Sequence, residues 1–172
     1  MLACVAPFAL RTMACCYTDG MTEPMSCLTL WQPYASLAAL GIKHSETRHW
    51  SAGFNNVGQR IGIHAAQRGM TPSEIAWFNA ACACEGISLR ARDLPLGVML
   101  ATARLTGIHR IITHRRGTAL LDGHAPIPLD AWGTYTPGRW VYLLDQVEPL
   151  VKPVAASGRQ RWWHWHPAAM AA

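Results

Sequence analysis

The 172-residue sequence is short of lysine, of long hydrophobic runs and of cysteines placed to act together. No stretch approaches the roughly 20 apolar residues that a helix needs to cross a bilayer, so we expect no membrane partner. Of the six cysteines, Cys82 and Cys84 form a Cys-x-Cys pair, with no second pair of that spacing to complete the four ligands of a closed zinc site. We therefore predict free thiols in a reducing cytoplasm, with no metal and no cofactor.

Motifs that identify well-known enzymes are also missing. The chain has no internal repeat, no phosphate-binding glycine loop and no spacing typical of a Ser-His-Asp triad. Basic residues outnumber acidic ones by 15 to 10, and all but Lys43 and Lys152 of the basic residues are arginine. An arginine excess suits bidentate recognition of phosphate, but it can equally reflect the base composition of the genome. The charge is therefore compatible with a polyanionic partner without requiring one.

The length indicates one domain with an extension at each end. The first 17 residues are apolar, but no basic segment precedes the apolar run, which is unlike a secretion signal. We predict a poorly ordered extension over residues 1–25, and translation starting at Met21 or Met25 is an alternative. The domain itself is expected over residues 26–166, followed by a frayed tail at residues 167–172.

The most informative stretch comprises residues 28–50. A β-rich apolar run at residues 28–31 predicts a strand. Pro33 suits the first position of a helix predicted over residues 34–40, because the missing N–H of proline would have no partner there. Gly41 then stands where a helix ends in a left-handed conformation.

The chain after Gly41 is expected to be extended, so its side chains alternate between two faces. One face then carries His44, Glu46, Arg48 and Trp50, and the other carries Lys43, Ser45 and Thr47. An unpaired buried charge is costly, so such a strand either faces water or lines a polar cleft. A simple surface ion pair between Glu46 and Arg48 is the alternative.

Two further elements have clear sequence signals. Residues 60–66 alternate isoleucines with other residues, which is typical of a strand buried on one side, and His64 lies on the face opposite the isoleucines. There His64 is either a structural residue or part of a site. Thr71 and Glu74 form a capping box at the start of a helix predicted over residues 73–85. Its core-facing stripe consists of Ile75, Phe78 and Cys82.

The second half of the chain predicts strands separated by loops. Residues 96–105 are almost continuously apolar, which favours a central strand covered on both faces. The basic segment 108–116, which contains Arg115 and Arg116, is either a solvated excursion or a flap that contacts phosphate. Residues 122–137 predict a loop. A strand is expected at residues 140–144, and a proline-containing edge strand at residues 147–154.

Near the C-terminus, Arg159 and Arg161 precede a group of tryptophans. Basic groups interleaved with aromatic rings can stack bases. The preferred interpretation is that the tryptophans at positions 162, 163 and 165 close one end of the domain core.

Two neighbouring blocks resemble a known family. Residues 41–48 have the form G-x-K-x-x-E-x-R, and W-Q-P-Y-A-S-L stands just upstream at residues 31–37. Together they are similar to the signature of the ASCH domain, named for homology to the activating signal cointegrator. The resemblance covers residues 27–165 and implies an α+β fold: a PUA-like small mixed β-barrel with flanking helices. It also implies a cleft at the mouth of the barrel.

That cleft would suit RNA, another single-stranded nucleic acid or a nucleoside-sized ligand. Lys43 and Arg48 offer donors to phosphate, and Glu46 can accept hydrogen bonds from a base edge. The predicted binding residues are Trp31, Gln32, Pro33, Tyr34, Lys43, Glu46, Arg48, Trp50, His64, Arg115 and Arg116. The first hypothesis is therefore a nucleic-acid-binding module.

An enzyme is the second hypothesis. Some ASCH-like proteins resemble ribonucleases in activity, and one branch hydrolyses the amide of N4-acetylcytidine with a threonine at the position that Glu46 occupies here. The amide-cleaving mechanism therefore does not transfer intact. Lys43 and Glu46 would be the catalytic residues, with Glu46 as general base and Lys43 stabilising negative charge. A protein-interaction domain with a vestigial cleft is the third hypothesis.

Overall fold

A computed structural model of the protein describes residues 23–166, which have a mixed α+β fold as predicted. The predicted tail and most of the predicted N-terminal extension lie outside the described residues. In chain order, the elements are β1 (Met25–Leu30), α1 (Tyr34–Ala39), β2 (Ser45–Arg48), η1 (Phe54–Asn56), β3 (Arg60–Ala65), α2 (Pro72–Glu85), η2 (Ala91–Asp93), β4 (Val98–Arg115), β5 (Thr118–Leu121), β6 (His124–Pro128), β7 (Trp140–Ala155) and β8 (Trp162–Trp165). No helix among residues 23–166 is long and apolar enough to span a membrane.

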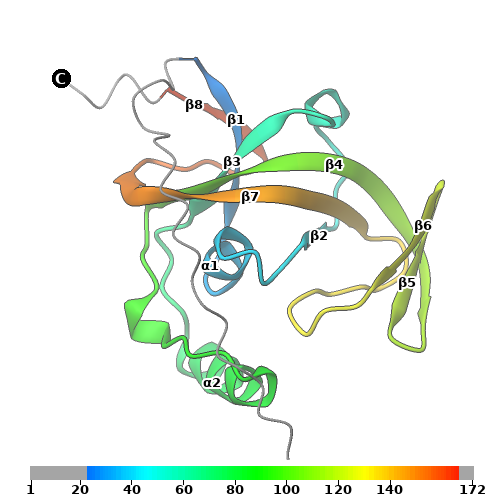
Figure 1. Ribbon diagram of the computed structural model, residues 1–172, viewed down its shortest axis with the longest axis horizontal. Coiled ribbons are helices and arrows are strands. Elements are labelled where there is room, and N and C mark those ends of the chain that lie inside the picture. The colour runs from blue at the N-terminus through cyan, green and yellow to red at the C-terminus, as the bar shows by residue number, and fades with distance from the viewer. Residues whose placement is uncertain (1–22, 167–172) are drawn as a thin grey trace, which may run out of the picture.

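The main sheet has the strand order β2-β7-β4-β3-β1-β8 (Figure 1). Strands β1 and β3 are parallel, and the other neighbours are antiparallel. The two longest strands, β4 and β7, pair along most of their length with three register shifts. Such irregularities bend strands, and the sheet curves around α1 (Figure 1). The far end of β4 leaves the main sheet and pairs with β5, which pairs with β6.

The sheet is not closed, so the predicted β-barrel is wrong in this respect. Its hydrogen-bonded path ends at β2 on one side and at β8 on the other. Side chains bridge the gap instead of a backbone ladder. Arg48 Nη2 on β2 donates to the carbonyl of Thr29 on β1 at 2.8 Å, and Trp162 Nε1 on β8 donates to the carbonyl of Ala52 at 2.9 Å. We call this gap the open seam.

Local sequence signals specify both helices. Gly41 ends the first helical segment with φ +67°. In α2, Thr71 accepts from the backbone N–H of Glu74, and the Glu74 carboxylate accepts from the backbone N–H of Thr71. The predicted capping box is therefore confirmed. The predicted core stripe holds for Phe78 and Cys82, but Ile75 is exposed.

Long-range pairing extends several strands beyond their predicted limits. Strand β4 includes both the predicted central strand and most of the basic segment. The strand continues beyond the main sheet because its residues 111–115 pair with β5. Strand β7 likewise joins the two strands predicted at 140–144 and 147–154. Its prolines, Pro149 and Pro153, lie where β7 pairs with β4 but not with β2, so that portion is an edge as predicted. The predicted loop at 122–137 contains the strand β6.

The core fills the space between α1 and the concave face of the sheet. Residues of α1 pack there against isoleucine and leucine side chains of β1, β3 and β4 and against Tyr142 of β7. Trp163 and Trp165 are buried against Cys27 and Met99, which agrees with the predicted structural role of the tryptophans. Burial raises the pKa of the Cys27 thiol to about 12, so this free cysteine is unreactive.

Candidate functional site

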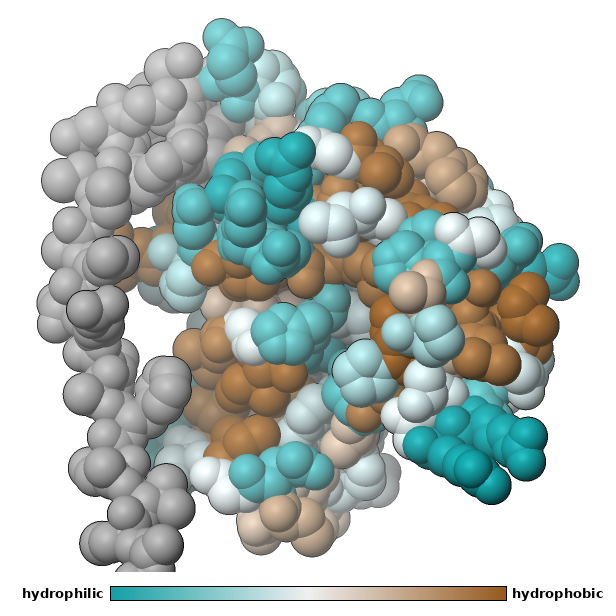
Figure 2. Space-filling view, turned by 45° about the vertical axis from the view of Figure 1, so that its right-hand side comes forward, coloured by the Kyte–Doolittle hydropathy of each residue, from teal (hydrophilic) through white to brown (hydrophobic). Residues whose placement is uncertain are grey.

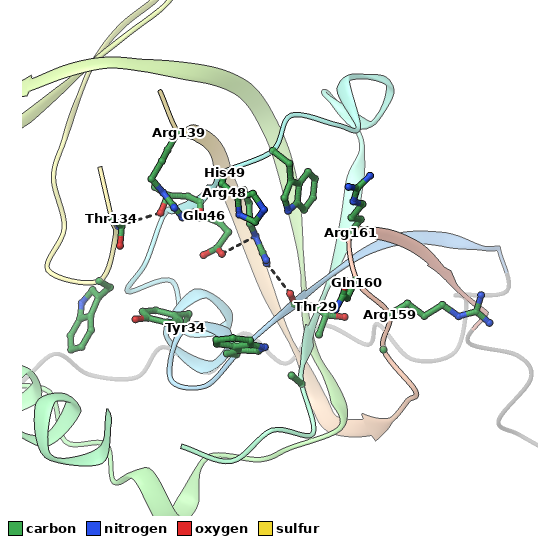
Figure 3. Close-up of a pocket in the computed structure, with 16 residues that line it drawn as sticks. Thr29, Tyr34, Glu46, Arg48, His49, Thr134, Arg139, Arg159, Gln160 and Arg161 are labelled. Atoms are coloured by element: carbon green, nitrogen blue, oxygen red, sulfur yellow. Dashed lines mark hydrogen bonds and ion pairs between the residues drawn. The ribbon is translucent and has the colours of Figure 1, made fainter. Parts of the chain in front are cut away.

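A cleft of about 630 Å³ lies beside the open seam. Strand β2 and the residues after it form one wall, the end of β1 and the start of α1 form the base, and the segment before β8 forms the opposite wall (Figure 3). Sixteen residues line it: Thr29, Trp31, Tyr34, Glu46, Thr47, Arg48, His49, Trp50, Ala66, Trp132, Thr134, Arg139, Gly158, Arg159, Gln160 and Arg161. The predicted polar strand therefore lines a cleft.

A chain of three charged groups runs from the cleft wall into the protein interior. Lys43 Nζ contacts Glu46 Oε2 at 3.0 Å, and Arg48 Nε contacts Glu46 Oε1 at 3.0 Å. The Arg48 guanidinium also donates through Nη2 to the carbonyl of Thr29, which fixes its position. Each oxygen of the Glu46 carboxylate thus has one cationic partner, and the carboxylate has a fixed orientation. Figure 3 shows its pair with Arg48.

Lys43 does not line the cleft. Its side chain is only 2% exposed, and its ammonium group also donates to the carbonyl of Ser45. The alternation of faces predicts Lys43 opposite Glu46, whereas its predicted binding role came from the resemblance, and the cleft lining does not include it. Lys43 therefore holds Glu46 from behind instead of meeting a ligand.

Aromatic side chains surround the charged groups. Trp31 is 55% exposed, and the guanidinium of Arg68 lies 4.3 Å from the centre of its ring. Arg68 is in turn paired with Glu74 of the capping box at 3.0 Å, so the start of α2 helps to orient Trp31. Tyr34 and Trp50 also line the cleft, as predicted.

The opposite wall supplies cations that the sequence analysis did not assign to the site. Arg159 and Arg161 are exposed and belong to the segment between β7 and β8 (Figure 3). Together with Arg48 and Arg139, they bring the arginines among the described lining residues to four, against one lining carboxylate, Glu46. The described lining therefore has an excess of three formal positive charges when His49 is neutral. The Arg159 side chain extends away from Glu46 (Figure 3).

The loop between β6 and β7 is anchored to β2. Arg139 Nη2 donates to the Thr47 carbonyl at 2.9 Å, and the backbone N–H of Thr134 donates to Thr47 Oγ1 at 3.2 Å. The hydroxyl of Tyr135 lies 2.8 Å from Ser45 Oγ and donates to Asp130 at 2.8 Å. Burial raises the pKa of Tyr135 to about 12, so this hydroxyl stays protonated and bridges the loop and the strand.

His64 supports the cleft from outside it. The ring is buried, its Nε2 lies 3.0 Å from the carbonyl of Ala156, and it packs edge-on against Trp163. It also lies directly beneath Gly158, where an added Cβ would come within 2.2 Å of the imidazole. Burial lowers the pKa of His64, which favours the neutral ring. Of its two predicted roles, the structural one fits this environment.

The other predicted site residues do not line the cleft. Gln32 is buried and donates to Ser36 Oγ and to the Pro95 carbonyl, at 2.8 and 2.7 Å, and Pro33 is buried beside it. Arg115 and Arg116 lie at the turn between β4 and β5, on the projecting hairpin (Figure 1). In Figure 2, the most strongly hydrophilic group of residues on the visible face lies at the lower right, on the side where this hairpin projects.

Most cleft residues missed from the sequence carry a partial signal. Arg159 and Arg161 stand in the basic and aromatic segment near the C-terminus, and Arg139 ends the Gly-rich turn before β7. Nothing in the sequence relates these segments to Glu46, because more than 90 residues separate them. Trp132 and Thr134 have no local signal, since they lie in a segment predicted only as loop.

The chemistry available in the cleft is recognition of an anionic, partly aromatic ligand. Arginines can bind phosphate through paired hydrogen bonds, and the aromatic rings can contact a planar ring. The residues described here contain no cluster of three or more His, Cys, Asp or Glu that could hold a metal ion.

Comparison with known proteins adds no relative. No family model matches the sequence, and no curated protein matches it significantly.

Proposed function

We propose that this protein is an ASCH-type nucleic-acid-binding protein that holds unpaired nucleotides of RNA or another single strand in the cleft. The observation that carries this proposal is the combination, among the described residues of one cleft, of four arginines, the exposed ring of Trp31 beside the half-buried rings of Tyr34 and Trp50, and one buried carboxylate. The cleft volume of about 630 Å³ falls within the usual range of small-ligand sites, about 300–1,000 Å³. It is therefore of a size for nucleotides and not for a double helix.

The two kinds of lining residue support different parts of such a ligand. Arg159 and Arg161 are exposed at the rim, where a continuous phosphate backbone can pass. Trp31 and Tyr34 lie at the base and offer ring faces on which an unstacked base can lie. The G-x-K-x-x-E-x-R block supports assignment to the ASCH family, because its Glu46 and Arg48 are in this same cleft.

Hydrolysis is less well supported than binding. Glu46 is the natural general base, but each of its oxygens is already in an ion pair. Lys43 is too deeply buried to contact a developing negative charge on a ligand. The arrangement fixes the carboxylate firmly, which favours a recognition role over proton transfer.

Fluorescence anisotropy with a labelled single-stranded RNA of seven nucleotides tests the proposal. We expect affinity to fall with salt, and a duplex of the same sequence to bind more weakly. The double substitution Arg159→Ala and Arg161→Ala should weaken binding and reduce the log–log salt slope by about 1.4, since each phosphate contact on a single strand contributes about 0.7.

The matched control is the double substitution Arg92→Ala and Arg104→Ala, which removes two exposed arginines outside the cleft. It should leave the affinity nearly unchanged. Failure of the single strand to bind at low salt, or equal losses for the two double variants, would refute the proposal. Shortened RNA after long incubation would support the hydrolase instead.

A further inference from the structure

One feature of the cleft goes beyond general affinity for nucleic acid. Glu46 is a carboxylate among arginines, at a place where a purely phosphate-binding surface would have no acidic group. It is 9% exposed, yet it reaches the cleft between the two walls (Figure 3). An ionised carboxylate accepts hydrogen bonds and donates none, so the part of the ligand that meets it must present N–H or O–H groups.

We propose that Glu46 selects guanine, by accepting hydrogen bonds from the N1–H and the 2-amino group of an unpaired guanine base. This inference rests on the proposed nucleotide-binding function of the cleft. Guanine presents two adjacent donors on its Watson–Crick edge, and their spacing matches the two oxygens of a carboxylate.

The other bases match a carboxylate less well. Adenine and cytosine each present one amino group next to a ring nitrogen that accepts hydrogen bonds, and this acceptor would face a carboxylate oxygen. Uracil presents one N–H between two carbonyl oxygens, which would also meet Glu46 with like partial charges. A buried acceptor opposite another acceptor loses a hydrogen bond that both groups make in water.

The surroundings of Glu46 leave it able to accept. A carboxylate has about four acceptor positions; Lys43 donates a hydrogen bond to one of them, on Oε2, while Arg48 Nε lies 3.0 Å from Oε1 as an ion pair without forming a hydrogen bond. These two cations, one behind the carboxylate and one beside it, fix its orientation before a ligand arrives. A preorganised acceptor discriminates more strongly than a mobile one, because no ordering cost is added on binding.

The competing explanation is that Glu46 only neutralises Lys43 and Arg48. It predicts no preference among bases, since the carboxylate would then make no contact with the ligand. The two explanations therefore differ in a measurable quantity, which is the dependence of affinity on the identity of one base.

The experiment uses the full-length protein and seven-nucleotide RNAs in which every position except the central one is uridine. The central position carries guanine, 7-deazaguanine, inosine, adenine, cytosine or uracil. We expect guanine to bind about 5- to 150-fold more tightly than adenine, cytosine or uracil, as for other bidentate base contacts. The 7-deazaguanine RNA keeps the two donors and should match guanine. Inosine lacks the 2-amino group, so its affinity should be intermediate.

Equal affinities for guanine, inosine and adenine would overturn the guanine proposal while leaving the binding function intact. If none of the six RNAs binds, both the guanine proposal and the proposed nucleic-acid-binding function are overturned. A loss with 7-deazaguanine as large as that with adenine would also overturn it, because recognition would then involve the other edge of the base.

The substitution Glu46→Gln provides an independent test, because an amide offers only one acceptor beside one donor. We expect it to reduce the preference for guanine over adenine to less than threefold. The result counts only if circular dichroism shows the variant folded, since the substitution leaves Lys43 without its carboxylate. The comparison of guanine with inosine needs no variant and decides the proposal by itself.

Discussion

The buried pair of Lys43 and Glu46 yields a stability prediction that can be worked out from the structure. The Lys43 side chain is 2% exposed and that of Glu46 is 11% exposed. Replacing Glu46 by glutamine leaves a buried ammonium group whose remaining partner in the structure is the Ser45 carbonyl. Breaking a buried ion pair by removing one partner costs about 3–5 kcal/mol. A typical domain has a total stability of about 5–15 kcal/mol, so the loss is a large fraction of it.

Removing the Lys43 ammonium group as well should restore part of this lost free energy of unfolding. In the double variant Lys43→Met with Glu46→Gln, an apolar chain of similar length replaces the ammonium group. We expect the double variant to be at least 1 kcal/mol more stable than the sum of the single losses implies, because neither uncompensated charge remains. Urea unfolding followed by tryptophan fluorescence measures all three free energies.

Glu148→Gln is the matched control. Glu148 pairs with Arg60 at 2.7 Å, but its side chain is 46% exposed. Such surface pairs contribute about 0–1 kcal/mol. If Glu46→Gln costs no more than Glu148→Gln, or if the losses of the two single variants simply add, then burial does not determine the energy of the Lys43–Glu46 pair and the reasoning is wrong.

Three further predictions concern the supports of the cleft. Burial lowers the pKa of His64 below 6.5, so the unfolded state binds more protons than the folded state between the two pKa values. The free energy of unfolding therefore decreases as pH falls from above 6.5 through the folded pKa. His64→Gln should flatten this pH dependence in urea unfolding at pH 5 to 8, and an unchanged slope would contradict the prediction. Thr71→Ala should cost about 0.5–2 kcal/mol in the same assay through loss of the capping box, whereas Ser88→Ala, at an exposed position, should cost less than 0.5 kcal/mol. Gly158→Ala should weaken RNA binding in anisotropy titrations, because its Cβ would lie 2.2 Å from the His64 ring and the segment must move; wild-type affinity would refute this.

The sequence by itself specified the local elements. Proline, glycine and capping residues restrict the backbone within a few residues of their own position, so the positions of Gly41 and Thr71 predicted where α1 and α2 end and begin. Hydrophobic patterning predicted the central strand, and Pro149 and Pro153 predicted the edge character of the strand that contains them. Each of these features depends on neighbours in the chain and not on distant partners.

The cleft could be only half predicted from the sequence. Glu46 and Arg48 belong to the segment 41–48 that carries their signal, and the structure brings them together with Trp31, Tyr34 and Trp50. The predicted binding role of Lys43 was wrong, because a family motif names residue types but does not show which of them a cleft leaves accessible. The Lys43 side chain is 2% exposed and pairs with Glu46 outside the cleft lining.

Only the tertiary structure decided which distant segments complete the cleft and whether the sheet closes. Arg159 and Arg161 line the same cleft as Glu46 because β8 pairs with β1, and this pairing spans more than 130 residues of sequence. The open seam depends on the same pairing, since β2 and β8 become the two ends of one curved sheet. Strand pairing between remote segments depends on the packing of the whole core, so a local pattern of residues cannot specify it.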